Sequence, residues 1–344
     1  MKTYNIGILG FGTVGSGVFD IFSKNADIIK EKNCLAVNVK RILDLRKFPG
    51  SPAENLITTN FDDIVSDNEI SLVVEVLGGE QPAFDFCKQA LAAKKSVVTS
   101  NKELVEKHGA ELMKIAFENG VHFLFEASVA GGIPVIRCLN ESFNSDSVIE
   151  ISGILNGTTN YILTKMTKDG QSFEDALADA QSLGYAEQNP SADIEGTDAC
   201  RKLAILLSIA TGKDVDCRDI NTKGIDAVTT SQIAKANEKD GVIKLVAKAK
   251  IEKDNVFAQV APMFIGKESS LFKVDGALNA VSIRGSATGE ITLIGMGAGK
   301  LPTASAIASD IIAALTRRPS APFWCEQRQS VASFPAQYAE RFSI

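Results

Sequence analysis

A short glycine-rich segment near the start of the chain most constrains how it can fold. The segment matches the pattern GxGxxG and consists of Gly10, Phe11, Gly12, Thr13, Val14 and Gly15. Apolar, β-favouring residues 4–9 precede it, and a helical pattern follows it to about Ile29. A strand, a tight glycine turn and a helix in this order are typical of a dinucleotide-binding unit. The glycines let the backbone turn tightly and approach a pyrophosphate, and the helix N-terminus offers N–H groups to the anion.

Strands and helices continue to alternate through the first 130 residues. Four further apolar segments read as strands, at residues 36–44, 71–79, 96–100 and 121–127. Pro82 opens a helix that we expect to end at Lys94 and Lys95. This alternation predicts an α/β protein with a doubly wound, parallel Rossmann-type sheet. The alternative is a similar scaffold whose glycines serve only the turn.

The end of the second predicted strand bears on which dinucleotide would bind. Asp44 lies where an acceptor for the ribose 2′-hydroxyl is expected, later than usual because the first helix is long. A carboxylate there repels a 2′-phosphate and favours NAD. Arg46 and Lys47 follow, and either could hold that phosphate, so NADP stays open.

A second glycine-rich segment occurs late in the chain. Residues 295–299 follow the strand-like GEITLIG and precede a helix that Pro302 opens and that runs to about Leu315. Too few residues remain for another βαβ unit, so we expect the chain to return here to the nucleotide-binding domain.

These features predict two domains. The first is a dinucleotide-binding domain of residues 1–130 and 297–344. The second is an α+β domain of residues 131–296, whose mixed sheet we build from strands at 148–155, 256–265 and 279–294.

Composition argues against several classes of function. A formal net charge of −6 without a block of Lys and Arg argues against a nucleic-acid partner. No run approaches the roughly 20 apolar residues that cross a bilayer, and the N-terminal glycine rhythm fits a nucleotide loop better than a signal peptide. Two histidines, and six cysteines without zinc spacing, make a zinc site improbable. We therefore expect a cytoplasmic protein with reduced thiols.

Polar side chains follow the later strands. Lys102 comes after the strand at 96–100, and Glu126 ends the strand at 121–127; ligands of open α/β sheets bind at this edge. A lysine at a helix N-terminus is otherwise unfavourable. After the strand at 148–155, residues 156–159 (Asn-Gly-Thr-Thr) offer an amide, hydroxyls and N–H groups. Capping of the following helix is the simpler explanation of that cluster.

The segment 184–202 combines carboxylates with a lysine. Asp198 and Lys202 are four residues apart on a helical pattern, so they share one face. The polar loop before them could bring Glu187 to the same place. The alternative is an exposed ion pair that stabilises the helix by about 0.2–0.5 kcal/mol.

Six segments of the chain together carry a resemblance to a known family. The residues concerned are GFGTVG at 10–15, VVTSNK at 97–102, EASVAGGIP at 126–134, GILNGTTNYIL at 153–163, LGYAEQNPSADIEGTDACRKLAIL at 183–206 and GAGKLPTASAIASDI at 297–311. The chain resembles homoserine dehydrogenases over nearly all of its length. Such enzymes are NAD(P)-dependent oxidoreductases that interconvert L-homoserine and L-aspartate 4-semialdehyde in threonine and methionine biosynthesis. The resemblance implies a small-molecule substrate and a homodimer or larger homo-oligomer. It also implies that residues 131–296 are the substrate-binding and dimerisation domain.

The resemblance also implies roles for individual residues. Lys102 and Lys202 would be the lysines at the reacting centre, with Asp198 beside them. The substrate would be bound by Glu187, which faces its amino group, and by Asp198, Gly157 and Thr158. The cofactor would be bound by the GxGxxG segment and by Asp44, Arg46, Lys102 and Gly299. A monovalent cation, usually sodium, would be held by Glu126, Val129, Gly131 and Ile133, in part through backbone oxygens.

Two departures from the family pattern stand out. Many members carry a basic residue just before the position of Asp44, where this chain has Leu43, and this weakens the case for NADP. Some members carry a C-terminal regulatory domain or an aspartate kinase domain, and neither would fit in the roughly 30 residues after Leu315.

A chemical hypothesis follows for the lysines. Hydride leaves the alcohol carbon while a base removes the hydroxyl proton, and a lysine can be that base only if its pKa falls from about 10.4. Burial or a second cation would lower it. We expect Lys202 to accept the proton, Asp198 to hold this lysine or a water in place, and Lys102 to polarise the oxygen, although the lysine roles could be exchanged. Two rival hypotheses are a non-catalytic nucleotide sensor, which would lack these lysines and acids, and a dehydrogenase for another amino-acid alcohol or semialdehyde.

Overall fold

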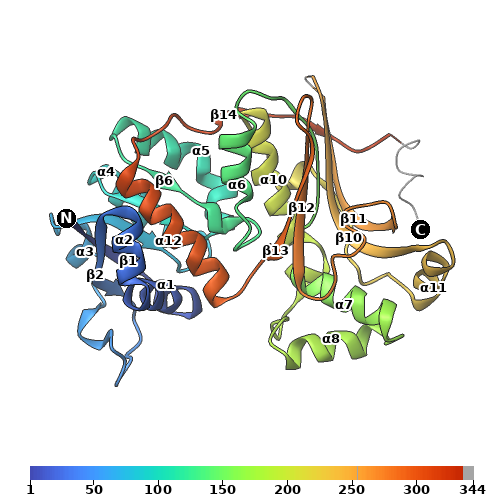
Figure 1. The fold of residues 1–344 in the computed structure, drawn as a ribbon, viewed down its shortest axis with the longest axis horizontal. Helices are drawn as coiled ribbons and strands as arrows, with labels where there is room; N and C mark the ends of the chain where they lie inside the picture. The colour runs from blue at the N-terminus through green and yellow to red at the C-terminus, as the bar shows by residue number, and fades with distance from the viewer. Residues whose placement is uncertain (254, 336–344) are drawn as a thin grey trace. The chain divides into compact units, whose positions relative to one another are not determined.

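The computed structural model describes residues 1–253 and 255–335. The chain divides into two compact units (Figure 1). The first unit is Met1–Gly132 with Ala298–Glu326, and the second is Ile133–Gly297 with Gln327–Ile344, of which 336–344 lie outside the described residues.

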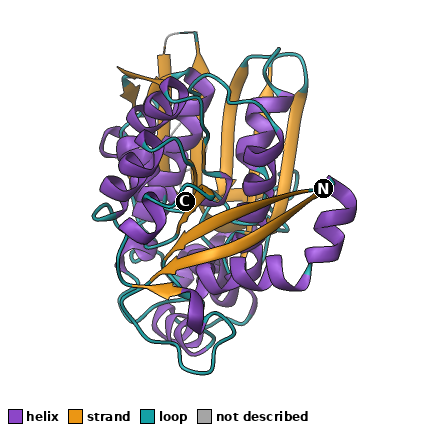
Figure 2. Cartoon of the chain, turned by 90° about the vertical axis from the view of Figure 1, so that its left-hand side faces the viewer, coloured by secondary structure: helices purple, strands orange, loops and turns teal. Residues whose placement is uncertain are grey.

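The first unit is built on a six-stranded sheet in the order β3-β2-β1-β4-β5-β6. The strands are β1 Lys2–Leu9, β2 Leu35–Leu43, β3 Ile57–Thr58, β4 Ile70–Glu75, β5 Ser96–Thr99 and β6 Phe123–Leu124. Every pairing is parallel, as the predicted doubly wound α/β sheet requires. Figure 2 shows β1 starting at the N-terminus and helices packed around the strands. The predicted fold class is thus confirmed.

The helices of this unit surround that sheet. They are α1 Thr13–Lys24, α2 Ala26–Asn33, α3 Asp62–Val65, α4 Ala83–Ala92, α5 Lys102–Glu118 and α12 Lys300–Thr316, with short 3-10 turns at Glu54–Leu56 and Glu126–Ser128. The single helix expected to reach Ile29 is in fact two, because the chain leaves helical geometry at Asn25.

The late helix α12 packs against α1, so the chain does return to the first unit after the second glycine segment. A Cβ on Gly17 of α1 would lie only 2.9 Å from the carbonyl oxygen of Lys300 and 3.0 Å from Cβ of Ala304. Ile307 and Ile311 of α12 belong to the same buried apolar cluster as Val18 of α1. Each fully buried side chain of this kind contributes about 1.5–3 kcal/mol.

Three element boundaries in this unit differ from the prediction. The strand expected at 71–79 ends at Glu75, because Gly78 and Gly79 have positive φ angles of 80° and 72° that a strand cannot contain. The helix expected to end at Lys94 and Lys95 stops at Ala92, two residues before Lys94 takes a φ of 58°. The strand expected at 121–127 is only Phe123–Leu124, and Glu126 begins a 3-10 turn.

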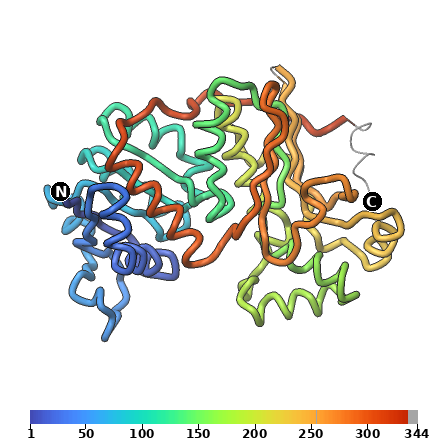
Figure 3. The backbone as a smooth tube through the Cα atoms, in the orientation of Figure 1, coloured from blue at the N-terminus to red at the C-terminus, as the bar shows by residue number. Residues whose placement is uncertain are grey.

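The second unit is built on a mixed sheet of seven strands. They are β7 Val148–Ile154, β9 Asn221–Thr222, β10 Gly241–Glu252, β11 Asn255–Gly266, β12 Leu278–Gly285, β13 Gly289–Met296 and β15 Val331–Ala332. The path runs β13-β12-β7-β10-β11-β15, and β9 also pairs with β11. Figure 3 shows the β10–β11 and β12–β13 hairpins as two long excursions of the chain, and β7 pairs with both β10 and β12 between them.

The strand predicted at 279–294 is wrong in one respect, because it is the hairpin of β12 and β13. The carboxylate of Asp146 accepts hydrogen bonds from the backbone N–H groups of Ala287 and Thr288. Gly289 then takes a φ of 79°, which completes the turn. The strand β10 was not predicted at all, although it is central in the sheet.

The remaining elements of the chain are short helices around this sheet and two small strands. The helices are α6 Val135–Arg137, α7 Gly157–Lys168, α8 Phe173–Ser182, α9 Ser191–Ile194, α10 Thr197–Thr211 and α11 Thr230–Glu238, with a π-turn at Cys138–Ser142 and a 3-10 turn at Cys217–Asp219. The small strands are β8 Lys213–Asp214 and β14 Cys325–Arg328. Among the helices of the described residues, none is both long enough and apolar enough to cross a bilayer.

Candidate active site

The GxGxxG segment forms a turn that only glycine can complete. Gly10 has a φ of 98°, and a Cβ on Gly15 would lie 2.0 Å from the carbonyl oxygen of Gly10. This close approach brings α1 against the end of β1 and points the N-terminus of α1, which begins at Thr13, toward the turn. Phe11 and Val14 pack in the apolar core beneath it.

A cavity of about 580 Å³ opens beside this turn in the first unit. Its lining combines Gly10 and Gly12 with Asp44, Arg46 and the loop 76–78. Glycine backbone, a carboxylate and a guanidinium around one cavity are the groups that a dinucleotide requires. The cavity therefore has room and chemistry for the adenosine end of such a cofactor.

Asp44 is held rigidly at the edge of this cavity. The N–H of Phe11 donates to Oδ2 of Asp44 at 2.8 Å, and Arg46 donates through Nε to Oδ1 at 2.9 Å and through Nη2 to Oδ2 at 2.8 Å. The Arg46 guanidinium lowers the pKa of Asp44 to about 2, with burial opposing it. Asp44 is therefore a carboxylate at neutral pH, and the charge of Arg46 is already engaged with it.

Lys102 is the first residue of α5. Asn101 caps this helix, since its Oδ1 accepts the N–H of Leu104 at 3.1 Å. Gly299, the other predicted cofactor residue, is the N-cap of α12 and has a φ of 116°.

The prediction missed Glu75 at the end of β4, which is fully buried near the turn before Lys102. Its signal was available, because a glutamate interrupts the otherwise apolar segment SLVVEVLGG.

A buried polar cluster lies in the second unit where β7 leads into α7 and α10 begins. We call it the lysine–carboxylate cluster and define it as Asn156, Asp193, Asp198 and Lys202. Nζ of Lys202 lies 2.8 Å from Oδ2 of Asp198 and donates to the carbonyl oxygen of Leu155 at 2.8 Å. Lys202 is 7% exposed and Asp198 is 4% exposed. The alternative of an exposed helix pair is therefore wrong.

Asn156 joins the two acids of this cluster. Its Nδ2 donates to Oδ1 of Asp193 at 2.7 Å and to Oδ2 of Asp198 at 2.9 Å. Its Oδ1 accepts the N–H of Thr159 at 2.9 Å, so Asn156 also caps α7. Capping and participation in the cluster are thus properties of the same side chain. The sequence pointed to the amide of Asn156 and favoured a capping role for it, but it gave neither Asn156 nor Asp193 a place in the predicted site. Their contacts across the fold give them that place.

Burial and charge act together on the acids. Burial raises the pKa of Asp193, and the negative charge of Asp198 raises it further, while hydrogen bonds from Asn156 and Thr158 oppose the rise. A buried carboxylate (Asp198) and a partly buried one (Asp193) next to one amine can exchange protons or attract a cationic group. This is the arrangement that acid–base chemistry on a charged small molecule needs.

The other predicted substrate residues surround the start of α7. Gly157 is the first residue of α7, and the hydroxyl of Thr158 donates to the carbonyl oxygen of Tyr185 at 2.6 Å. This bond anchors the loop after α8, which carries Glu187. The side chain of Glu187 is exposed, whereas Asp198 and Lys202 are buried.

The predicted cation-binding loop contains a buried carboxylate and has unusual backbone geometry. Glu126 is buried, and its N–H donates to Oδ2 of Asp310 in α12 at 2.8 Å. Ala130 and Gly131 have φ angles of 55° and 50°, which fold the loop after Val129 back on itself. A buried carboxylate among backbone carbonyls suits a hard cation. Ile133, the fourth predicted ligand, is buried at the start of the second unit.

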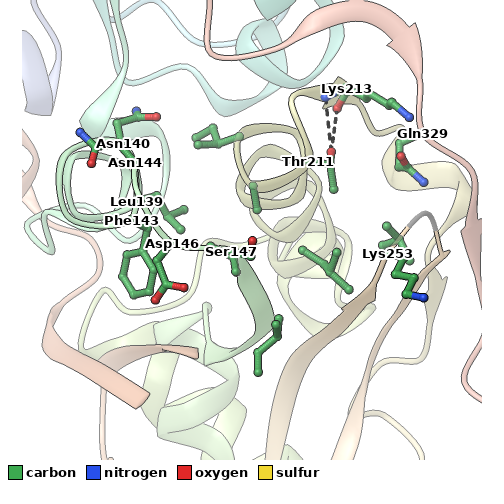
Figure 4. A pocket seen from close by; sticks show the side chains of 16 residues that line it. Leu139, Asn140, Phe143, Asn144, Asp146, Ser147, Thr211, Lys213, Lys253 and Gln329 are labelled. Carbon is green, nitrogen blue, oxygen red and sulfur yellow. Dashed lines mark hydrogen bonds between the residues drawn. The ribbon is translucent and has the colours of Figure 1, made fainter. Parts of the chain in front are cut away.

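A separate cavity of about 640 Å³ lies in the second unit (Figure 4). Its lining includes Asp146, Thr211, Lys213, Lys253 and Gln329. The carboxylate of Asp146 is already occupied by the hairpin turn described above. None of the predicted site residues lines this cavity, so it does not bear on the predicted reaction.

Comparison with protein families identifies the chain. A model described as "Homoserine dehydrogenase" matches residues 134–312, and one described as "Homoserine dehydrogenase, NAD binding domain" matches residues 10–126. The chain belongs to the homoserine dehydrogenase family. It is therefore an oxidoreductase with an NAD-binding domain, as the resemblance predicted.

Individual homoserine dehydrogenases agree over most of the chain. The enzyme of Helicobacter pylori is 40% identical over 338 residues, which are 98% of this chain and 79% of that protein. The enzyme of Bacillus subtilis is 39% identical over 92% of this chain and 73% of its own length. A crystal structure from Thiobacillus denitrificans is 40% identical, with a TM-score of 0.86, and covers 91% of this chain and 73% of that one.

A further solved structure bears on the cofactor. It is described as a hyperthermophilic archaeal homoserine dehydrogenase in complex with NADPH. It is 30% identical to this chain, has a TM-score of 0.76, and covers 93% of this chain and all of that one. That relative thus binds a nicotinamide dinucleotide, and the NAD-binding domain model matches this chain.

Proposed function

We propose that this homoserine dehydrogenase interconverts L-homoserine and L-aspartate 4-semialdehyde, as a step toward threonine and methionine. The observation that carries this proposal is the buried lysine–carboxylate cluster, which unites an amine, two acids and an amide in a member of this family. Homoserine is a zwitterion with a hydroxyl group, and it needs groups that hold its charges and one that moves the hydroxyl proton.

Lys202 is the proposed proton acceptor. The bound nicotinamide supplies the hydride acceptor, and the chain must supply the base. Burial favours the neutral amine that this role requires, while the carboxylate of Asp198 at 2.8 Å favours the ammonium form. In this proposal Lys202 takes the proton of the substrate hydroxyl as the hydride leaves and returns it in the reverse reaction. Asp198 and the carbonyl oxygen of Leu155 fix the direction in which Lys202 points.

The other residues take supporting roles in this proposal. Asp198, Gly157 and Thr158 shape the substrate site, and Glu187 faces the amino group of homoserine. Lys102 polarises the reacting oxygen and contacts the cofactor. In this proposal the first unit, Met1–Gly132 with Ala298–Glu326, is the dinucleotide-binding domain, and the second unit is the substrate-binding and dimerisation domain. The segment from residue 327 onward, which the sequence led us to expect in the nucleotide-binding domain, belongs to the second unit, and 336–344 lie outside the described residues. The active form is a homodimer or larger oligomer.

NAD is the proposed preferred cofactor. Asp44 is a fixed carboxylate, and Arg46 is engaged with it in a two-point ion pair instead of being directed toward a phosphate. A 2′-phosphate would meet the negative charge of Asp44 before it could recruit Arg46. The proposed monovalent cation is sodium, held by Glu126, Val129, Gly131 and Ile133.

One assay tests the reaction. Purified protein is mixed with L-homoserine and either NAD or NADP, with sodium or potassium present, and the absorbance of the reduced cofactor is followed. We expect reduction of the cofactor, faster with NAD, and oxidation of it when aspartate semialdehyde is supplied. Absence of turnover in both directions with both cofactors would reject the proposal. Comparable turnover of other amino-acid alcohols would favour the rival substrate instead.

A further inference from the structure

Glu75 is a buried acid that the proposed mechanism does not use. It is the last residue of β4 and is 0% exposed. Its Oε1 accepts the N–H of Leu77 at 2.8 Å, and its Oε2 accepts the hydroxyl of Thr99 at 2.5 Å. An apolar residue would stabilise a central strand more, because burying a carboxylate costs free energy unless hydrogen bonds replace its water. Burial accordingly raises the pKa of Glu75 while these donors oppose the rise.

The contacts continue from Thr99 to the beginning of α5. The hydroxyl of Thr99 also accepts the N–H of Asn101 at 2.9 Å. Asn101 caps α5 through Oδ1, and its Nδ2 donates to the carbonyl oxygen of Gly79 at 2.6 Å. Lys102 follows directly as the first residue of that helix.

These bonds form a closed ring that joins two turns at the same edge of the sheet. Glu75 fixes the start of the loop 76–79 through Leu77, Asn101 fixes its end through Gly79, and Thr99 joins the two sides. The loop residues Val76, Leu77 and Gly78 line the dinucleotide cavity. One ring therefore determines both the wall of that cavity and the backbone position of Lys102.

We infer that Glu75 is a positioning residue, which through Thr99 and Asn101 holds the loop 76–79 for the dinucleotide and Lys102 for the reaction. The part that concerns Lys102 rests on the proposed function, whereas the part that concerns dinucleotide binding does not. In the structure both carboxylate oxygens of Glu75 accept a hydrogen bond. A glutamine of the same shape would turn a donor toward either Leu77 or Thr99.

Glu75→Gln is the central variant, with Glu69→Gln as its matched control. Glu69 undergoes the same chemical change a few residues earlier, but it is exposed and pairs with Lys40 at the surface. We expect Glu75→Gln to weaken NAD binding, measured by titration without substrate, and to lower kcat by about 10- to 100-fold, as small misplacements of catalytic groups do. Glu69→Gln should match the wild type in both measurements.

Two variants of Thr99 keep the test decisive if Glu75→Gln folds poorly. Thr99→Val removes the hydroxyl that links the two turns, and Thr99→Ser retains it. Thr99→Val should reproduce the losses, and Thr99→Ser should restore NAD affinity and kcat to within about threefold of the wild type. Equal behaviour of the Val and Ser variants would overturn the inference, because a role in packing alone would not depend on the hydroxyl.

A double-mutant cycle separates positioning from general damage. If Glu75 acts through Lys102, Glu75→Gln should lower kcat by less than about threefold in a Lys102→Ala background. Losses that multiply, or wild-type NAD affinity and kcat in Glu75→Gln, would overturn the inference. If the wild type fails to oxidise homoserine, the proposed function falls, while NAD titration of the Glu75 and Thr99 variants still decides the role of Glu75 in cofactor binding.

Discussion

The two units each bury a polar group where a strand meets a helix, but they compensate its charge differently. In the first unit, Glu75 is held by an N–H and a hydroxyl, which are neutral donors. In the second unit, Asp198 is held by the amine of Lys202 and the amide of Asn156. Neutral donors fix a carboxylate in place without offering it a proton at neutral pH. An amine can exchange protons, so the second arrangement suits chemistry and the first suits positioning.

Removing the amine of Lys202 or of Lys102 should have the largest effect on kcat. We expect Lys202→Ala and Lys102→Ala each to lower kcat by about 10²-fold or more, because each removes a lysine that we place at the reacting centre. Steady-state rates with NAD and homoserine measure the loss. In Lys202→Ala the carboxylates Asp193 and Asp198 also lose their cation, so the unfolding temperature should be recorded beside the rate. Near-normal turnover in either variant would remove that lysine from the mechanism.

Changing the acid at the cofactor cavity should shift preference between cofactors. We expect Asp44→Ser to raise the ratio of kcat/KM for NADP to that for NAD by about tenfold, equivalent to about 1.4 kcal/mol. The physical reason is that Arg46 loses its partner and becomes available to a 2′-phosphate. Arg46→Ala is the control, because it should not improve the use of NADP. An unchanged ratio in Asp44→Ser would show that Asp44 does not discriminate between cofactors.

A substitution of Glu187 tests whether this exposed acid contributes to binding the substrate near the lysine–carboxylate cluster. We expect Glu187→Ala to raise KM for homoserine by about tenfold while kcat changes little, because in our proposal Glu187 binds the substrate amino group and takes no part in the proton transfer. Glu174 is another acid, which lies in α8, the helix that precedes Glu187. Glu174→Ala therefore serves as a control for general charge effects. An unchanged KM would count against the amino-group role.

The smallest expected effect concerns stability. Because burial and Asp198 raise the pKa of Asp193, its ionisation costs stability as pH rises above about 3.8, the ordinary value for Asp. Asp193→Asn carries no such charge, so we expect its unfolding temperature at pH 7 to exceed that of the wild type by about 1–2 °C. The gap should close below pH 3.8, where both side chains are neutral. A gap independent of pH, measured by calorimetry, would contradict this origin.

Local sequence patterns predicted the first unit better than the second. The GxGxxG segment, Asp44 and the parallel strands depend on short-range signals, and each was found near its predicted place. The hairpin of β12 and β13 was missed because its turn is set by Asp146, more than 140 positions away in the sequence. The strand β10 was missed because its burial comes from neighbours on both sides.

In the candidate site, too, features that depend on contacts distant in the sequence could not be predicted. The spacing of Asp198 and Lys202 put them on one helix face, but spacing could not tell a buried pair from an exposed one. The dual role of Asn156 and the position of Asp193 depend on contacts between α7, α9 and α10. Glu75 was visible as an acid in an apolar strand, yet its partner Thr99 could be identified only from the pairing of β4 with β5.

The packing of α12 on α1 has a consequence for how the chain is made. Val18 and Phe22 of α1 share a core with Ile307 and Ile311, which the ribosome delivers almost 300 residues later. At synthesis rates of about 5–20 residues per second, the face of α1 that α12 covers stays uncovered for roughly 15–60 s. During that interval the nascent nucleotide-binding unit exposes an apolar surface. This is therefore the stage of synthesis at which chaperones would protect the chain most.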